Sequence, residues 1–319
     1  MFHFDGGLFL TSPRLAIDCR RRQPQAFVSH AHSDHMARHD VAICTPATGR
    51  LYQLRLGQRK VRELPYRQPL DYCGVQLTTY PAGHCLGSAM LLADDGQQSL
   101  LYTGDFKLGE SATSERAELP QADLLVLECT YGEPEYRLTP RAQVIADLLE
   151  LVRRTLTDEA TPVIQAYTLG KSQEVTRILT LAGIPVLQHR SIFEVSQVYS
   201  ACGVDLGDYR VYADGPLPGH AVIVPPRMHR PETLPGLKRV ITIAVTGWAM
   251  KDAVRGRWGA DYAMPLSDHA DYDELFDAVA RVAPREVYCT HGPETFADRL
   301  REAGYNAHTL GKGTQLRLF

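Results

Sequence analysis

Short runs of apolar residues alternate along the chain with segments in which apolar residues recur every three or four positions. The short runs are rich in Val, Ile, Leu and Tyr, which predicts buried strands. The helical period is clear over residues 141–152 and 272–279, and Asp271 is placed to cap the second of these helices. This alternation of strands and helices predicts an α/β protein. The main predicted strands cover residues 76–80, 99–102, 124–127, 162–165 and 239–244.

Metal-ligating side chains follow a short apolar run near the start of the chain. The loop after Ala26–Val28 contains four of them within six positions: His30, His32, Asp34 and His35. Imidazole nitrogen and carboxylate oxygen suit Zn²⁺, and Mn²⁺ or Fe²⁺ tolerate the same set. A histidine-rich surface loop would not need an adjacent aspartate and histidine aimed at one point. A single ion would not need so many ligands, so the pattern predicts two.

Three further strand ends carry the same kinds of side chain. His84 lies in a loop between Gly83 and Gly87, where the backbone can approach a metal closely. Asp105 follows the apolar strand over residues 100–102, and His291 follows another apolar strand. Each residue alone has a simpler interpretation as a turn aspartate or a histidine at a strand end. Together they predict ligands that converge from four separate places in the chain.

With these motifs the chain resembles the metallo-β-lactamase superfamily over nearly its whole length. The resemblance implies an αββα sandwich with two divalent metal ions, for which Zn²⁺ is favoured and Mn²⁺ is the alternative. The ligands that it implies are His30, His32 and His84 for one ion, Asp34, His35 and His291 for the other, and Asp105 as the bridge.

Three more motifs resemble those of the β-CASP nucleases within this superfamily. Glu128 lies in a segment similar to their acidic motif, and residues 166–174 are similar to a motif of their inserted domain. His269 lies in a segment similar to their second histidine motif, and His291 is similar to the third. The implied domains are a catalytic domain over 1–136 and 252–319, interrupted by a β-CASP-like α/β domain over 137–251. The middle of the chain shows no metal ligand and has its own alternation of strands and helices, as an insertion would.

The resemblance implies hydrolysis of a phosphodiester, whose charge two cations can neutralise. Asp34 belongs to the catalytic cage. His269 is the candidate general acid, because the pKa of an imidazole lies near working pH, and Glu128 is expected to orient it. Lys171 and Ser172 begin a helix after Gly170, and we predict that they contact a phosphate of the substrate, with plain helix capping as the alternative.

The favoured function is that of a DNA exonuclease in repair, because the chain looks most like bacterial exonucleases associated with an ATP-dependent DNA ligase. A DNA ligase and a helicase are therefore the expected partners. An RNA-processing nuclease, like the 3′-end processing factors, is the alternative, since the family members with histidine in the third motif mostly act on RNA. A small-molecule hydrolase would not need Glu128, His269 or the inserted domain. The sequence leaves open exo- or endonuclease action, polarity and oligomeric state.

Composition agrees with a cytoplasmic enzyme that does not enter a membrane. Hydrophobic residues make up 44% of the 319, without an apolar run long enough to span a bilayer. Seven cysteines without Cys-x-x-Cys spacing predict reduced thiols. A formal charge of −3 argues against indiscriminate coating of nucleic acid but allows a local basic groove. Candidates for that groove are Arg20–Arg22 and the basic residues between 50 and 62, which could equally be solvated surface.

Overall fold

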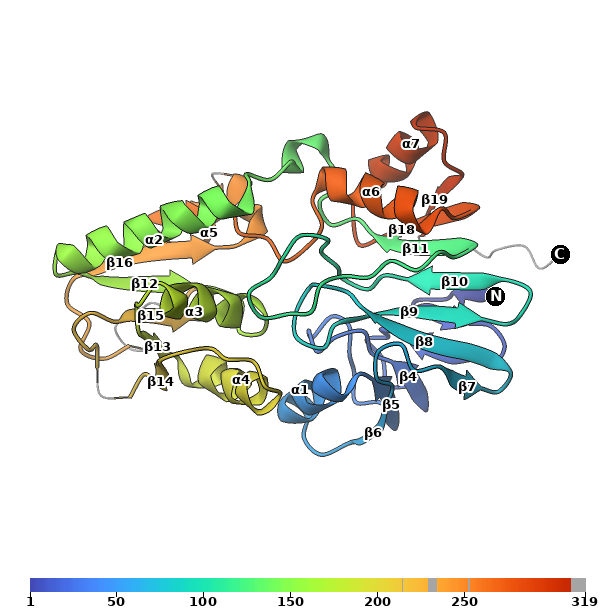
Figure 1. Ribbon diagram of the computed structural model, residues 1–319, viewed down its shortest axis with the longest axis horizontal. Coiled ribbons are helices and arrows are strands. Elements are labelled where there is room, and N and C mark those ends of the chain that lie inside the picture. The colour runs from blue at the N-terminus through green and yellow to red at the C-terminus, as the bar shows by residue number, and fades with distance from the viewer. Residues whose placement is uncertain (214, 229–233, 252, 311–319) are drawn as a thin grey trace. The chain divides into compact units, whose positions relative to one another are not determined.

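The computed structural model describes residues 1–213, 215–228, 234–251 and 253–310, and they form two compact units (Figure 1). The first unit contains Met1–Arg137 and the C-terminal part of the chain from His269, and the second contains Leu138–Asp268. The second junction lies later than the predicted boundary at 251, because β17 (Tyr262–Met264) pairs with a strand of the second unit. The insertion therefore ends directly before His269.

The first unit begins with a six-stranded mixed sheet whose strands follow one another in chain order. The first three strands are antiparallel and the later ones are parallel. Helix α1 (Pro46–Leu56) connects the last two strands, and Thr45 caps it by accepting a hydrogen bond from the backbone of Thr48. The strands are β1 (Phe2–Phe4), β2 (Leu8–Leu10), β3 (Leu15–Ile17), β4 (Gln25–Phe27), β5 (Val41–Cys44) and β6 (Lys60–Glu63).

A seven-stranded sheet in the order β19-β18-β11-β10-β9-β8-β7 forms the other half of the first unit. Its strands are β7 (Leu70–Tyr72), β8 (Val75–Pro81), β9 (Ala89–Asp94), β10 (Ser99–Tyr102), β11 (Leu124–Glu128), β18 (Glu286–Thr290) and β19 (Ala307–Thr309). The chain also forms α6 (Tyr272–Val282), α7 (Thr295–Glu302) and the short 3₁₀ helix η1 (Pro134–Tyr136) in this unit.

Alternation along β10 shows how the layers form. Leu100 and Tyr102 pack in a core shared with Phe27 and Ile43 of the first sheet, whereas Leu101 packs on the opposite face. Successive side chains of a strand point to opposite faces, so both faces of this sheet are buried. The outer face is covered by α6 and α7, and α1 contacts β5 and β6 of the other sheet. This is the predicted αββα sandwich.

Strand direction brings distant segments to one edge of the second sheet. β10, β11 and β18 are parallel neighbours, and β8 runs in the same direction because β9 is antiparallel to both β8 and β10. Their carboxyl ends therefore lie at the same edge of the sheet (Figure 1). The predicted ligands His84, Asp105 and His291 follow three of these ends, and Glu128 is the last residue of the fourth.

The second unit is a parallel sheet in the order β14-β13-β15-β12-β16-β17. Apolar residues such as Val163, Leu187 and Val222 fill its core. Its strands are β12 (Thr161–Gln165), β13 (Val186–Gln188), β14 (Tyr209–Val211), β15 (Ala221–Val224), β16 (Val240–Val245) and β17. Its helices are α2 (Arg141–Thr157), α3 (Lys171–Leu181), α4 (Arg190–Ala201), α5 (Ala253–Trp258) and the 3₁₀ helix η2 (Gly247–Met250).

The seven cysteines are all free thiols, and five of them are buried. A buried thiol packs as a small apolar side chain. Within the part of the chain that the structure describes, every helix is too short or too polar to cross a bilayer.

Candidate metal centre

The loop after β4 is held by groups that lie outside the histidine motif. The carboxylate of Asp18 accepts hydrogen bonds from the backbone N–H of Ser29 at 2.7 Å and from its hydroxyl at 2.5 Å. Arg55 donates to the backbone oxygen of Ala31, between the first two histidines. One of the arginines that we considered for a basic groove thus supports the loop instead.

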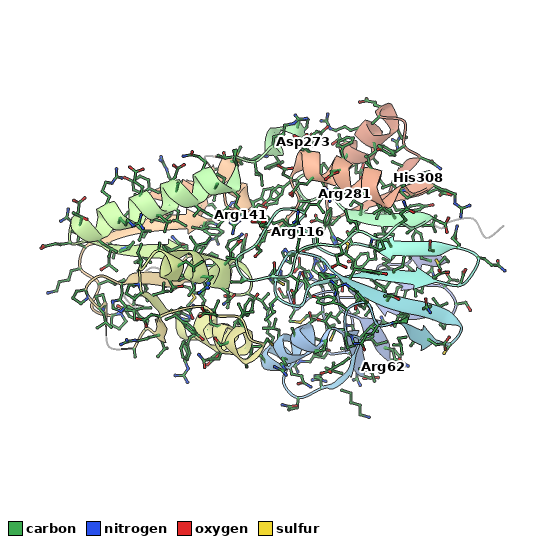
Figure 2. The ribbon with its side chains drawn as sticks, in the orientation of Figure 1. Arg62, Arg116, Arg141, Asp273, Arg281 and His308 are labelled. Carbon is green, nitrogen blue, oxygen red and sulfur yellow. The ribbon has the colours of Figure 1, made fainter. Side chains whose placement is uncertain are left out.

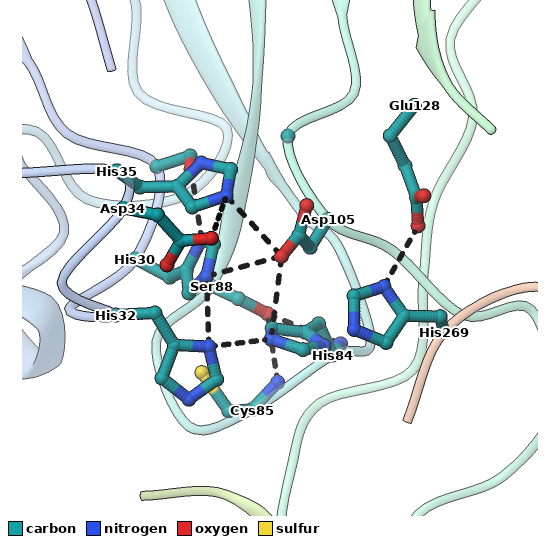
Figure 3. A network of polar contacts seen from close by, with 12 residues as sticks. His30, His32, Asp34, His35, His84, Cys85, Ser88, Asp105, Glu128 and His269 are labelled. Carbon is teal, nitrogen blue, oxygen red and sulfur yellow. Dashed lines mark hydrogen bonds and ion pairs between the residues drawn. The ribbon is translucent and has the colours of Figure 1, made fainter. Parts of the chain in front are cut away.

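The first group of converging side chains is His30, His32 and His84 together with Asp105 (Figure 3). His32 Nδ1 lies 3.1 Å from Nε2 of His30 and 3.1 Å from Nε2 of His84. The carboxylate of Asp105 is 3.4 Å from His30 Nε2 and 3.9 Å from His84 Nε2. Ser88 shapes the loop of His84, because its hydroxyl accepts hydrogen bonds from the backbone of His84 and Cys85.

The second group is His35, Asp105 and His291. Nε2 of His35 lies 3.3 Å from the Asp105 carboxylate, and the rings of His35 and His291 are 5.2 Å apart. Asp34 lies beside this group, with its carboxylate 3.9 Å from His35 Nε2 and half of its side chain exposed. The single carboxylate of Asp105 is thus shared by the two groups, as a bridging ligand would be.

The spacing of these atoms fits a metal ion. Two nitrogens bound to one Zn²⁺ at about 2.0–2.1 Å in a tetrahedral arrangement lie about 3.3 Å apart. His32 Nδ1 has nearly this separation from Nε2 of His30 and from Nε2 of His84. Burial, followed by the charge of His35, holds the pKa of His30 well below its ordinary value. His30 is therefore neutral at pH 7 and offers the lone pair that a metal requires.

Charge is arranged differently around His35. Burial acts to lower the pKa of His35, but the charges of Asp105 and Asp18 and their hydrogen bonds outweigh it and hold that pKa well above its ordinary value. Burial likewise acts to raise the pKa of Asp105, and the charges of His35 and then His269 outweigh it and keep the pKa low. The buried carboxylate of Asp105 is thus surrounded by imidazoles that compensate its charge.

Asp18 and Tyr102 also support the site, although neither was predicted from the sequence. Asp18 accepts a hydrogen bond from His35 Nδ1 at 2.8 Å and another from the Tyr102 hydroxyl at 2.8 Å. A carboxylate behind a ligating histidine fixes its ring and raises its basicity. Asp18 directly follows the apolar strand β3, the same strand-end position that identified Asp105, so the signal was present in the sequence.

His291 has a left-handed backbone conformation in the turn after β18. Its φ is 54°, a left-handed conformation that costs a residue with a side chain about 1–2 kcal/mol. The next residue, Gly292, lies so close to the carbonyl oxygen of Cys129 that a Cβ there would be 1.9 Å from it. The turn after β18 therefore requires glycine at 292 and strains His291, which is typical of a functional position.

Glu128 and His269 form a pair next to this centre. Nδ1 of His269 lies 3.1 Å from the Glu128 carboxylate, which is almost fully buried at the end of β11 (Figure 3). The two residues also lie in one cluster with Asp105. His269 precedes α6, which Asp271 caps as predicted, in a capping box with Glu274.

The start of α3, where we predicted a contact with a phosphate of the substrate, lies inside the second unit. Lys171 and Ser172 are both fully buried. The Lys171 ammonium lies 2.9 Å from Glu174 and 3.8 Å from Asp268, while the Ser172 hydroxyl donates to the backbone oxygen of Tyr167. The backbone N–H groups at the helix start also bond within the unit. These side chains therefore help to stabilise the second unit, and their burial disfavours the predicted contact with a phosphate.

Comparison with known proteins identifies the family of this chain. Residues 262–310, which include both His269 and His291, match the model described as "Zn-dependent metallo-hydrolase RNA specificity domain". The chain belongs to the β-CASP group of the metallo-β-lactamase family. A solved structure of a protein of unknown function from Enterococcus faecalis has the same fold, with a TM-score of 0.63 and 14% identity over 90% of this chain and 79% of that one.

Three curated relatives of this β-CASP chain differ in their named roles. A probable DNA ligase of Opitutus terrae is 39% identical over 99% of this chain and 31% of its own length. The cleavage and polyadenylation specificity factor subunit 3 of Dictyostelium discoideum is 29% identical over 66% of this chain and 26% of its own. The DNA cross-link repair protein pso2/snm1 of Schizosaccharomyces pombe is 23% identical over 82% of this chain and 48% of its own. The chain thus spans from about a quarter to about a half of the length of these relatives.

Proposed function

We propose that this protein is a binuclear metal-dependent nuclease that hydrolyses phosphodiester bonds, with DNA as the favoured substrate. The observation that carries the proposal is the shared position of Asp105. Its carboxylate lies in both groups of histidines and also in one cluster with Glu128 and His269. Ligands for two cations and a candidate proton donor therefore meet at one point.

The proposed ligands are those that the resemblance implies. His30, His32 and His84 would hold one ion, while Asp34, His35 and His291 would hold the other, and Asp105 would bridge them. Zn²⁺ is favoured by the imidazole-rich set, and Mn²⁺ is the alternative. Two such cations about 3.5–4 Å apart would neutralise a phosphodiester and acidify a water molecule.

The chain's own side chains would then move one proton and hold the site in place. His269 would donate a proton to the leaving oxygen, because its ring lies beside the centre with its centroid 4.7 Å from that of His84. Glu128 would hold the ring of His269 through Nδ1 and favour its protonated form. Neither residue is needed to complete the two ligand groups, so a role in proton transfer accounts for their position.

The choice of DNA rests on the relatives. The match to the probable DNA ligase covers nearly the whole of this chain, although that protein is about three times as long. This supports action alongside a DNA ligase, and with it the helicase of such a repair system. RNA is the second candidate substrate, because the matching model is described by RNA specificity and a relative is a polyadenylation factor subunit. A small-molecule hydrolase is disfavoured by the Glu128–His269 pair.

One assay separates these substrates. Single-stranded DNA and RNA of the same sequence, each labelled at the 5′ or the 3′ end, are incubated with the protein and Zn²⁺, Mn²⁺ or Mg²⁺. We expect metal-dependent degradation of DNA from one end and slower degradation of RNA. Faster cleavage of RNA would assign the protein to RNA processing. Cleavage of neither polymer, with hydrolysis of small esters retained, would contradict the nuclease proposal.

A further inference from the structure

The parallel sheet of the second unit has a point at which its connections diverge. From the carboxyl end of β12 the chain runs through α3 to β13, whereas from the end of β16 it runs through η2 and α5 to β17, on the other side of the sheet. β12 and β16 are parallel neighbours, so both connections leave the same edge. Open parallel sheets commonly bind ligands beside such a switch point, outside the carboxyl ends of the strands. The proposed metal ligands all belong to the first unit, so this edge is a separate part of the molecule.

A phosphate is a frequent ligand at such an edge, because the helix after the strand offers its backbone N–H groups. In this unit the start of α3 is occupied by its own side chains. The backbone N–H of Gly170 donates to the side chain of Gln173 at 2.9 Å, and the Lys171 ammonium binds Glu174. A ligand at this edge therefore has to be bound by the side chains that follow the strands.

Aromatic residues follow both strands of the switch point and remain exposed. Tyr167 is two residues beyond the end of β12, and Trp248 is three residues beyond the end of β16. Their exposed fractions are 41% and 37%. The ring of Tyr167 packs edge to face against Trp258, with the centroids 5.5 Å apart, and its backbone oxygen accepts a hydrogen bond from the Ser172 hydroxyl at 2.7 Å. An exposed ring that is already held in place can stack on a ligand at a low cost in entropy.

An exposed arginine follows the adjacent strand on the other side of β12. β15 is parallel to β12, and Arg227 is three residues beyond its end. The backbone N–H of Arg227 donates to Oε1 of Gln165, the last residue of β12, at 2.7 Å. Its φ of 66° is a left-handed conformation that is unfavourable for a residue with a side chain. Since neighbouring strands are about 4.8 Å apart, the ends of β15, β12 and β16 together span about 10 Å.

We propose that this edge is a stacking site for bases of single-stranded nucleic acid, in which Tyr167 and Trp248 contact bases and Arg227 contacts a phosphate. Aromatic side chains stack on unpaired bases of any sequence, and a nearby cation neutralises the backbone. The bases of a duplex are already stacked on one another, so the site favours an unpaired strand. This inference rests on the proposed nuclease function and deepens it, because it predicts a preference for single-stranded substrate.

The proposal also gives a role to the motif over residues 166–174, which resembles one of the β-CASP nucleases. Ser172 and the rest of the helix start do not bind a phosphate themselves. They fix the backbone at Tyr167, and the exposed ring of Tyr167 then makes the contact with the substrate. Ser172 is thus a positioning residue for an aromatic side chain.

The fluorescence of tryptophan provides a direct test, because Trp248 and Trp258 are the two tryptophans of the chain and Trp258 contacts Tyr167. A labelled single strand of phosphorothioate DNA, which resists hydrolysis, is titrated into the metal-loaded full-length protein. Anisotropy of the label measures affinity, and quenching of the tryptophan emission reports stacking. We expect strong quenching by the single strand and little by a duplex of the same sequence.

Tyr167→Ala should weaken binding of the single strand about 5–150-fold, the usual effect of losing one stacking side chain. Tyr167→Phe keeps the ring and should bind as the unsubstituted protein does. Tyr262→Ala is the matched control. Tyr262 has a similar exposed fraction, 39%, but it begins β17, two strands away from β12, and its hydroxyl contacts Arg154 of α2. Tm is measured for each variant, and Trp248→Leu, followed by anisotropy, decides the question should Tyr167→Ala fail to fold.

The outcomes separate this inference from the proposed function. Weaker binding and less quenching in Tyr167→Ala but not in Tyr262→Ala support the stacking site. Equal affinity in both variants, or equal quenching by single strand and duplex, overturns it, as would be found for aromatic residues that serve a protein partner. Cleavage of ordinary DNA by the unsubstituted protein then leaves the nuclease proposal intact. If neither DNA nor RNA is cleaved while Tyr167→Ala still binds more weakly, the nuclease proposal fails and the stacking site stands.

Discussion

His35 donates a hydrogen bond from Nδ1 to the carboxylate of Asp18 at 2.8 Å, although the two residues are separated by a strand and a turn. The same carboxylate accepts hydrogen bonds from Ser29 and Tyr102. Asp18 therefore ties together the loop of the first motif, a predicted ligand and the end of β10. Through Ser29 and His35, Asp18 thus contacts both ends of the loop that carries the histidines.

Substitution of Asp18 should weaken metal binding without removing a ligand. The amide of Asp18→Asn lacks the negative charge that orients the ring of His35 and raises its basicity as a ligand. We therefore expect the affinity for the second ion to fall about 10–100-fold. Titration with a chelator of known affinity measures this change. Asp40→Asn, whose carboxylate binds only the exposed Arg22 among the contacts described, is the control. Unchanged affinity in Asp18→Asn would contradict the supporting role.

Elemental analysis should find two divalent ions for each chain. Asp105→Ala should lower the content of both, because its carboxylate lies in both ligand groups, whereas His291→Ala should affect one. Two ions retained in His291→Ala would show that the second group is assigned wrongly.

His269→Ala should retain both ions and lower the rate of the chemical step by about 10²–10⁴-fold, the usual effect of losing a general acid. Glu128→Gln should have the same effect in milder form, because an amide still bonds to His269 Nδ1 but does not stabilise its charge. Single-turnover cleavage of labelled DNA measures the step, and metal content is determined in parallel. Loss of metal in His269→Ala would identify His269 as a ligand instead.

Lys171→Ala should destabilise the second unit. The substitution leaves Glu174 buried with one of its two cations, Arg141 at 2.9 Å, the residue labelled in Figure 2. Breaking a buried pair by removing one partner costs about 3–5 kcal/mol. Urea denaturation measures the free energy of unfolding, and Lys238→Ala, at an exposed position, should leave it unchanged. A stable Lys171→Ala protein with weaker binding of DNA would restore the phosphate contact predicted from the sequence.

Much of the architecture follows from local patterns. The apolar runs of β10 and β11 are continuous and are buried on both faces of a sheet, and a continuous run can be recognised without the rest of the chain. The helical period in α2 and α6 and the capping box of Asp271 are similarly local. The later end of the insertion was not predicted, because the three residues of β17 join the second unit only by pairing with β16.

The sequence by itself determined the types of ligand and their positions at strand ends, because a histidine or aspartate after an apolar run is visible without coordinates. Only the tertiary structure decided which of these side chains meet. Parallel pairing brings the ends of β10, β11 and β18 to one edge, and it places Asp105 in both ligand groups. The structure also revealed Asp18 and buried Lys171, because hydrogen bonds and exposure depend on the packing of segments far apart in the chain.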